Sequence, residues 1–296
     1  MNCYNRSDLA CESFSKTQVL PEGAEQSCER IGGFEIQRLR IQKQSASQAL
    51  GIPCGSYVTF VCGRLGAISQ EKAERLSHLL AGELRGFAAR LSGRSPDPDF
   101  SVLVVGLGNA ELTADAIGPK TISLLTATRH LRTHESGLYK ELGCCALSAL
   151  SPGVLGQTGI ETLELLRGAV KCVQPDLVVL IDALAARSCE RLATTVQLSD
   201  VGISPGSGVG NHRAAIRAES LGTPVLSIGV PTVVKSSTLV YDALTEAGIK
   251  DIDASLKRVL ENGKSFFVSP KESDVITQEV AKLLASSISL AFTGGY

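Results

Sequence analysis

Val102-Leu103-Val104-Val105-Gly106 is an unbroken apolar run that ends in a glycine. A run of this kind is typical of a strand that is covered on both faces, as in a parallel sheet. Residues 177–181 and 225–230 form two further apolar runs, and helical patterns over residues 115–131 and 159–173 lie between the three runs. Because strands and helices alternate along the chain, the sequence predicts βαβ units that build a largely parallel sheet.

The other predicted elements extend this α/β pattern toward both ends of the chain. Residues 34–41 and 57–62 resemble strands, and Ser69 is placed to cap a helix with one apolar face. Residues 269–272 read Ser-Pro-Lys-Glu, which matches a capping box before a last helix whose apolar stripe begins at Val275. We therefore expect a single α/β domain of the phosphorylase/hydrolase-like kind, with a mostly parallel sheet and helices on both faces.

The composition of the 296-residue chain argues against several classes of protein. Lysine and arginine total 29 while aspartate and glutamate total 30, so the net charge is −1 and no basic excess is available for nucleic-acid phosphates. Aromatic residues make up only 4%, which disfavours stacking platforms for single strands. Nine cysteines without a C-x-x-C motif favour reduced thiols in a cytoplasmic compartment. Without a secretory signal or an apolar run near the roughly 20 residues of a membrane span, we expect a soluble intracellular protein that contacts no membrane.

Two aspartates close to predicted strand ends form the first candidate for chemistry. Asp115 lies in the segment after the strand that ends at Gly106, and Asp182 directly follows the run at residues 177–181. Catalytic groups gather at the carboxyl ends of strands in open parallel sheets. If the two strands are neighbours, the carboxyl groups could share a proton, so that one activates a water and the other donates to a scissile carbonyl. From spacing alone, a helix cap and a loop contact remain an alternative interpretation.

Two other patterns suggest binding rather than acid–base chemistry. Residues 206–211 read Gly-Ser-Gly-Val-Gly-Asn, a glycine-rich loop that lacks the Lys-Ser/Thr ending of a phosphate-binding loop. Its backbone could instead lie close to an extended peptide. His130 and His134 have a spacing that suits metal ligands, but the glutamate of H-E-x-x-H is absent and charged residues surround them. We therefore expect neither a metal site nor a cofactor.

Six blocks of the sequence together resemble the germination proteases of spore-forming bacteria, an aspartic peptidase family. The blocks appear in the family's order and cover most of residues 34–296. They are VVGLGNAELTADAIGP at residues 104–119, SPGVLGQTGIET at 151–162, VLIDALAAR at 179–187, GISPGSGVGNHR at 202–213, GVPTVV at 229–234 and FVSPKE at 267–272.

This resemblance implies a substrate, a location, a fold and a set of site residues. Germination proteases degrade the small acid-soluble proteins that coat spore DNA, so these proteins are the expected substrate and the forespore or spore core is the expected location. The family's aspartate pair falls on Asp115 and Asp182, its fold is related to that of the hydrogenase maturation endopeptidases, and it suggests a homotetramer. The candidates for lining the substrate groove are Asn109, Thr158, Gly206, Gly208 and Asn211.

Four positions depart from the family's pattern. Ser204 stands where histidine is common, His212 where lysine is common, Lys235 where aspartate is frequent and Ala114 where proline is frequent. None of these changes removes an expected catalytic group, but each bears on the shape of the substrate groove.

The resemblance also implies that the chain is made as a zymogen and removes its own N-terminal segment. Substrates of the family carry an acidic residue before the cut, then an apolar residue and alanine, and Asp8-Leu9-Ala10 has this order. We expect autocleavage between Asp8 and Leu9, which makes residues 1–8 a propeptide and residues 9–296 the peptidase domain. Since the first 33 residues are polar and irregular, we expect residues 9–33 to form a mobile extension.

Two other classes of function remain open at this point. The first is a nickel-dependent maturation endopeptidase of the hydrogenase type, which would need carboxylates and histidines that converge at the strand ends. The second is a non-catalytic binding protein that uses the glycine-rich loop at residues 206–210. Incubation with small acid-soluble spore protein, with and without a chelator, separates these possibilities.

Overall fold

The computed structural model describes residues 7–14, 19–205, 214–249, 253–262 and 266–294. In this part of the chain, nine strands form one sheet in the order β1-β2-β3-β7-β8-β6-β4-β5, and β9 pairs with β8. The strands are β1 (Ala24–Ile31), β2 (Phe34–Ile41), β3 (Gly55–Val61), β4 (Ser101–Gly106), β5 (Ala146–Leu150), β6 (Leu177–Ala186), β7 (Thr195–Ser199), β8 (Val225–Lys235) and β9 (Phe267–Val268).

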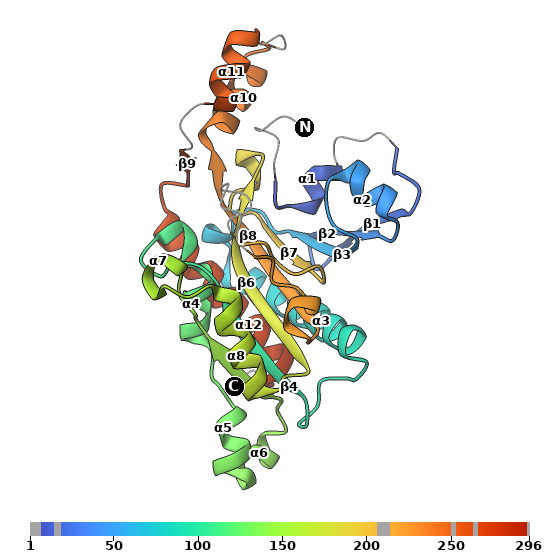
Figure 1. Ribbon diagram of the computed structural model, residues 1–296, viewed down its shortest axis with the longest axis vertical. Coiled ribbons are helices and arrows are strands. Elements are labelled where there is room, and N and C mark those ends of the chain that lie inside the picture. The colour runs from blue at the N-terminus through green and yellow to red at the C-terminus, as the bar shows by residue number, and fades with distance from the viewer. Residues whose placement is uncertain (1–6, 15–18, 206–213, 250–252, 263–265, 295–296) are drawn as a thin grey trace.

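Helices lie on both faces of this sheet, which confirms the α/β class (Figure 1). The α-helices are α1 (Ala10–Phe14), α2 (Gln44–Leu50), α3 (Gln70–Ser92), α4 (Ile117–Leu124), α5 (Arg129–His134), α6 (Ser136–Leu142), α7 (Leu155–Thr158), α8 (Thr162–Val173), α9 (Ala218–Leu221), α10 (Ser236–Glu246), α11 (Ala254–Asn262) and α12 (Ser273–Phe292). In Figure 1, α10 and α11 project at one end of the molecule and α5 and α6 at the other.

The sheet is mixed in direction. β5, β4, β6 and β8 are parallel neighbours and contain the three apolar runs that the sequence revealed. β1, β2, β3 and β7 extend the sheet in antiparallel pairs. β1 and β2 are joined only by Gly32 and Gly33, both with positive φ, and a connection of this length permits only an antiparallel pair. The predicted parallel arrangement therefore holds for the half of the sheet that contains β4, β6 and β8.

The strands β4 and β6 are buried on both faces because helices cover each side of the sheet. Val102 and Val104 of β4 belong to a core that includes residues of α3, α4 and α12. Leu103 and Val105 belong to a second core that includes residues of α8 and α9. This two-sided burial explains why residues 102–105 show no polar alternation.

The N-terminal segment differs from the expected mobile extension, because its described residues pack on the domain. Leu9 is fully buried, at 0% exposure, in an apolar cluster with Leu184, Ala186 and Val234. β1 pairs with β2 along its whole length, although most of its side chains are exposed. An edge strand with two solvated faces needs no apolar alternation, which explains why this sequence suggested irregular structure.

The predicted helix over residues 115–131 is broken into two. α4 ends at Leu124, and the chain is extended at Leu125 before α5 begins. The hydroxyl of Thr128 donates to the carbonyl oxygen of Cys145 at 2.6 Å and accepts from the N–H of Leu147 at 2.9 Å. These bonds attach the connection to β5, and such long-range bonds leave no periodic signal in the sequence.

The last helix, α12, also begins later than predicted. Its N-cap is Glu272, without a side-chain capping bond, so residues 269–272 do not form the expected capping box. Val275, the expected start of the buried stripe, is 50% exposed. The 20-residue helix α12 is long and apolar enough to cross a membrane, with a mean hydropathy of 1.3 over an 18-residue window, contrary to our expectation that no stretch would be. It packs against α3 and α4 with a largely buried face, as a core helix does.

Candidate active site

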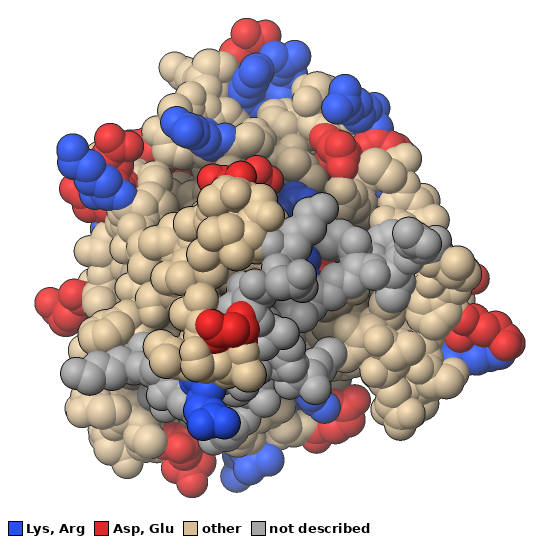
Figure 2. All heavy atoms as spheres, turned by 90° about the horizontal axis from the view of Figure 1, so that it is seen from above, with Lys and Arg blue, Asp and Glu red and all other residues tan. Residues whose placement is uncertain are grey.

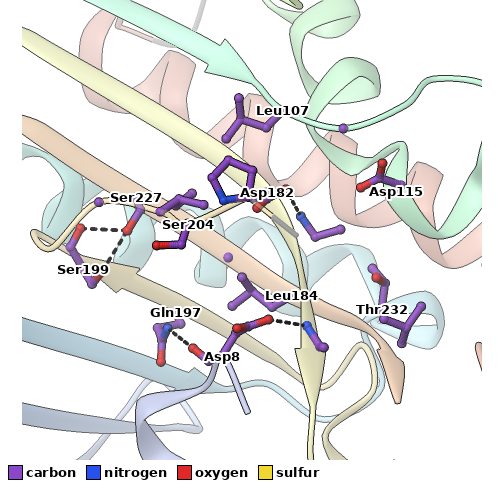
Figure 3. A pocket seen from close by; sticks show the side chains of 18 of the residues that line it. Asp8, Leu107, Asp115, Asp182, Leu184, Gln197, Ser199, Ser204, Ser227 and Thr232 are labelled. Atoms are coloured by element: carbon purple, nitrogen blue, oxygen red, sulfur yellow. Dashed lines mark hydrogen bonds between the residues drawn. The ribbon is translucent and has the colours of Figure 1, made fainter. Parts of the chain in front are cut away.

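A cavity of about 660 Å³ opens where β4 stops and β6 and β8 continue. Its walls come from the loop after β4, from β6, β7 and β8, and from the N-terminal segment. Asp115 and Asp182 both line this cavity, as do Asp8, Gln197 and Thr232 (Figure 3). The structure therefore brings the two predicted aspartates to one cavity, Asp115 from the turn after β4 and Asp182 from the neighbouring parallel strand β6.

Asp182 lies within β6 rather than in a loop after it, which corrects the predicted strand end at residue 181. β6 runs on to Ala186 because β8 continues beside it, with Asp182 opposite Gly229 and Ala186 opposite Val234. Asp182 is 7% exposed, and its Oδ1 accepts from the N–H of Ala183 at 3.0 Å. A carboxyl group on a regular strand is held more rigidly than one on a free loop.

Asp115 is positioned by the tight turn that follows β4. It ends a 3₁₀ turn (Thr113–Asp115) just before α4, and the N–H of Asn109 donates to its Oδ2 at 2.8 Å. Gly108 has φ +112°, and a Cβ at this position would lie 2.0 Å from the carbonyl oxygen of Asp115. Only glycine permits this approach, so the glycine at this turn serves to place Asp115.

The N-terminal segment enters the same cavity and bonds to the end of β6. The N–H of Asp8 donates to the carbonyl oxygen of Ala185 at 3.1 Å, and the N–H of Ala185 donates to Asp8 Oδ2 at 3.0 Å. The buried carboxylate of Glu12 accepts from the N–H groups of Arg187 and Ser188, at 2.8 and 3.0 Å. The N-terminal segment thus lies beside residues 185–188, where β4 no longer pairs with β6.

Gln197 is a site residue that the sequence analysis missed. Its Nε2 donates to the carbonyl oxygen of Asp8 at 3.1 Å, and its Oε1 accepts from the N–H of Ala10 at 2.7 Å. β7 contains three polar residues, Thr195, Gln197 and Ser199, at alternate positions, and all three are buried. Polar residues at every second position of a strand suggest that one face of the strand contacts solvent. The same pattern also fits a strand whose polar face lines a cavity.

Thr232 is a second site residue that the sequence analysis missed. It lies where the pairing of β6 with β8 shifts register between Leu184 and Ala185. Thr232 is 6% exposed and lines the cavity, and its hydroxyl has no hydrogen-bond partner among the described residues. Most buried hydroxyl groups are bonded, so this hydroxyl is available to a bound molecule.

The residues expected to line the groove fall into different places. Asn109 lies beside the cavity and bonds through Oδ1 to the N–H of Glu111 and to Gln157, both at 3.0 Å. The exposed Thr158 ends α7, and its hydroxyl donates to the carbonyl oxygens of Val154 and Ile160, so it does not line the cavity. Gly206, Gly208 and Asn211 lie outside the described residues, although the preceding Ser204 and Pro205 line the cavity.

Outside the cavity, the titratable groups include surface carboxylates and bases, and cysteines. Acidic and basic side chains are interspersed on the described surface that Figure 2 presents. The eight described cysteines are free. Burial raises the pKa of Cys62 to about 12 and that of Cys145 to about 12. Among the described residues, no group of three or more His, Cys, Asp and Glu side chains is arranged to hold a metal ion.

Comparison with known proteins relates this chain to one peptidase family. Residues 14–258 match the family model described as Germination protease. The chain is 39% identical to the germination protease of Caldanaerobacter subterraneus subsp. tengcongensis over 98% of this chain and 94% of that protein. It is 45% identical to the germination protease of Priestia megaterium over 72% of this chain and 56% of that protein.

Among solved structures, a nickel–iron hydrogenase maturation protease from Thermococcus kodakarensis is similar at a TM-score of 0.32. The two chains are 18% identical, and the match covers 65% of this chain and 94% of the other. The family match and the curated relatives extend over β4, the turn that carries Asp115, and β6 with Asp182. This chain belongs to the germination protease family.

Proposed function

We propose that this peptidase is an aspartic endopeptidase that starts the degradation of small acid-soluble spore proteins in the spore core during germination. Asp115 and Asp182 are its catalytic pair. The observation that carries this proposal is that both carboxyl groups line one cavity, together with a peptide segment of the acidic–apolar–small order. The family membership favours this function over nickel-dependent maturation and over simple peptide binding.

The chemistry that this pair can perform is proton transfer on both sides of a peptide bond. Two carboxyl groups in one cavity can hold a single proton between them. The ionised carboxylate removes a proton from a water, which attacks the carbonyl carbon of the peptide bond. The protonated carboxyl donates its proton to the carbonyl oxygen as the water oxygen bonds to the carbonyl carbon. The carboxyl that took the water proton then donates it to the amine nitrogen as the C–N bond breaks, and the other carboxylate removes a hydroxyl proton, which restores the single shared proton. The proposed mechanism thus needs no group beyond this chain and a water.

Self-processing is the second part of the proposal. Asp8 and Ser7 line the cavity, so the bond between Asp8 and Leu9 lies at its edge. A segment that binds alongside an existing strand can be drawn into a site without unfolding the core. We propose that cleavage after Asp8 removes residues 1–8 and leaves a mature chain that begins at Leu9.

The experiment that tests the catalytic pair compares Asp115→Asn and Asp182→Asn with Asp99→Asn, an exposed aspartate outside the cavity. Purified small acid-soluble spore protein is the substrate, and a chelator is included in a parallel digest. We expect both cavity variants to lose proteolysis while their unfolding midpoints match that of the parent chain, and Asp99→Asn to keep full activity. A folded Asp115→Asn or Asp182→Asn protein with near-normal activity would refute the catalytic pair, and loss of activity with chelator would favour the nickel enzyme.

N-terminal sequencing tests the self-processing. The parent chain should mature to begin at Leu9, whereas Asp8→Ala and Asp115→Asn chains incubated alone should keep Met1. A different start after maturation would refute the site, and a matured Asp115→Asn chain would refute self-cleavage.

We also propose, from the family resemblance, that the protein assembles as a homotetramer. α10 and α11 project from the sheet and carry exposed apolar side chains, among them Leu239, Val240 and Val259 (Figure 1). Light scattering of the purified chain measures the assembly, and a monomer at micromolar concentration contradicts it.

A further inference from the structure

We propose that Gln197 is a substrate-binding residue that holds the peptide backbone on both sides of the residue after the cut. This inference rests on the proposed function, because it takes the bond between Asp8 and Leu9 as the bond that the enzyme cleaves. It identifies a group that binds the peptide backbone and fixes its position in the cavity.

The first support is the way the side-chain amide of Gln197 meets the N-terminal segment. Nε2 donates to the carbonyl oxygen of Asp8 at 3.1 Å, and this oxygen belongs to the bond that is to be cut. Oε1 accepts from the N–H of Ala10 at 2.7 Å. The two bonds bridge Leu9, so a single side chain fixes the backbone before and after this residue. Such a pair of bonds recognises any peptide backbone, whatever its side chains.

The second support is that other groups bind the side chains of the same three residues. Oδ2 of Asp8 accepts from the N–H of Ala185, which suits an acidic residue before the cut. Leu9 fills an apolar cluster with Leu184 and other residues. Ala10 is only 1% exposed, so a larger side chain would meet packed atoms. The contacts of Asp8, Leu9 and Ala10 thus match an acidic, an apolar and a small residue in this order, and Gln197 binds the backbone.

The third support is the position of Gln197 relative to Asp182. Gln197 of β7 pairs with Gly229 of β8, and Gly229 pairs with Asp182 of β6. Residues in one row across a sheet direct their side chains to the same face. Two strand spacings put the Cα atoms of Gln197 and Asp182 about 10 Å apart. At about 3.3 Å per residue, this separation corresponds to about three residues of an extended peptide.

The gap between these two residues is partly filled by Leu184. A Cβ on Gly229 would lie 2.3 Å from Cδ1 of Leu184, so glycine at this position leaves room for the leucine. Figure 3 shows Leu184 between Asp182 and Asp8 in that view. Leu184, which packs on Leu9, thus also lies between Gln197 and Asp182.

The fourth support is that Gln197 is 7% exposed and both polar atoms of its amide bond to the N-terminal segment. A substrate peptide can enter only after this segment leaves. A buried amide without partners is destabilising, so the emptied site favours a new peptide that restores both bonds. A purely structural glutamine would instead bond to fixed parts of the domain.

A double-mutant cycle between the protein and the peptide tests this assignment. The substrate is a synthetic peptide with the sequence of residues 4–12, and its analogue has an ester oxygen in place of the alanine N–H that Gln197 accepts. Cleavage between aspartate and leucine is followed by mass spectrometry for the parent protein, Gln197→Ala, Gln197→Glu and the control Gln37→Ala. Gln37 lies on β2 and bonds to Glu35, away from the cavity.

For the parent protein, we expect the ester to lower kcat/KM about tenfold, the usual effect of one lost hydrogen bond. Gln197→Ala should cleave the amide peptide at least about tenfold more slowly and show no further loss with the ester. Gln197→Glu keeps the acceptor and loses the donor, so it should remain sensitive to the ester. Gln37→Ala should behave as the parent.

Two results would overturn the inference in different ways. An ester penalty that is equal in the parent and in Gln197→Ala would show that Gln197 does not bind the alanine N–H, while the proposed function would stand. Because the ester alters only the peptide, its effect on the parent protein can be measured even if a variant folds poorly, and the absence of any ester penalty in the parent would also overturn the inference. Failure of the folded parent to cleave the amide peptide between aspartate and leucine would instead remove the proposed function, and the inference with it.

Discussion

Replacement of Leu9 by alanine should release the N-terminal segment from the cavity. Leu9 is fully buried in a cluster with Leu184, Ala186 and Val234, so its truncation removes packing that the small cluster cannot easily replace. Truncation of a buried leucine costs about 2–5 kcal/mol, and a middle value of about 3 kcal/mol corresponds to roughly 100-fold in an equilibrium constant. A terminal segment can detach alone, so the cost appears in local docking rather than in global unfolding.

Amide hydrogen exchange measures this docking directly. The N–H groups of Asp8 and Ala10 are bonded to Ala185 and Gln197 and should be protected while the segment is docked. In an Asp115→Asn chain, which we expect to stay intact, Leu9→Ala should lower the protection of these amides by about 100-fold.

The control is Val19→Ala, because Val19 lies in the same N-terminal region and is 80% exposed. This change should leave the exchange of Asp8 and Ala10 as it was. Unchanged protection in the Leu9→Ala chain would refute the reasoning, since it would mean that hydrogen bonds to β6 and β7 hold the segment without its apolar anchor.

Two further predictions concern the cavity wall and the thiols. Thr232→Val should raise the free energy of unfolding, measured in urea titrations, by about 1 kcal/mol, because it removes a buried hydroxyl that has no partner among the described residues. A decrease of about 1 kcal/mol would contradict this and would mean that the hydroxyl is hydrogen-bonded. Iodoacetamide at pH 8 should modify the exposed Cys54 and Cys172, without loss of activity, and spare Cys62 and Cys145, because burial raises the pKa of the latter two to about 12. These raised pKa values also mean that the folded state should lose stability as the pH rises from 9 toward 12, and a rise in stability over that range would contradict the burial.

The parallel half of the fold was predictable from the sequence because its signal is local. Val102–Val105 and residues 177–181 are apolar without interruption, and burial on both faces of a sheet requires that composition. The order of strands and helices then follows from their alternation along the chain. Edge strand β1 gave no such signal because a solvated edge imposes no pattern on its side chains.

The resemblance of short motifs identified Asp115 and Asp182, and the tertiary structure decided what surrounds them. β6 continues past residue 181 only because β8 runs beside it, which moves Asp182 from a loop into a strand. Gln197 comes to the site from β7 by pairing across Gly229, a contact between residues far apart in the sequence.

The docking of Asp8 beside Ala185 is likewise a long-range contact. Hydrophobic periodicity depends on residues that are close together in the sequence, so it does not indicate which strands lie side by side in the sheet. The chain's sequence by itself therefore determined the strands of the parallel half and pointed to the two carboxyl groups. The pairing of strands across the sheet determined the cavity, the bonds of Gln197 to the N-terminal segment and the place of that segment, because these depend on contacts that only the folded chain forms.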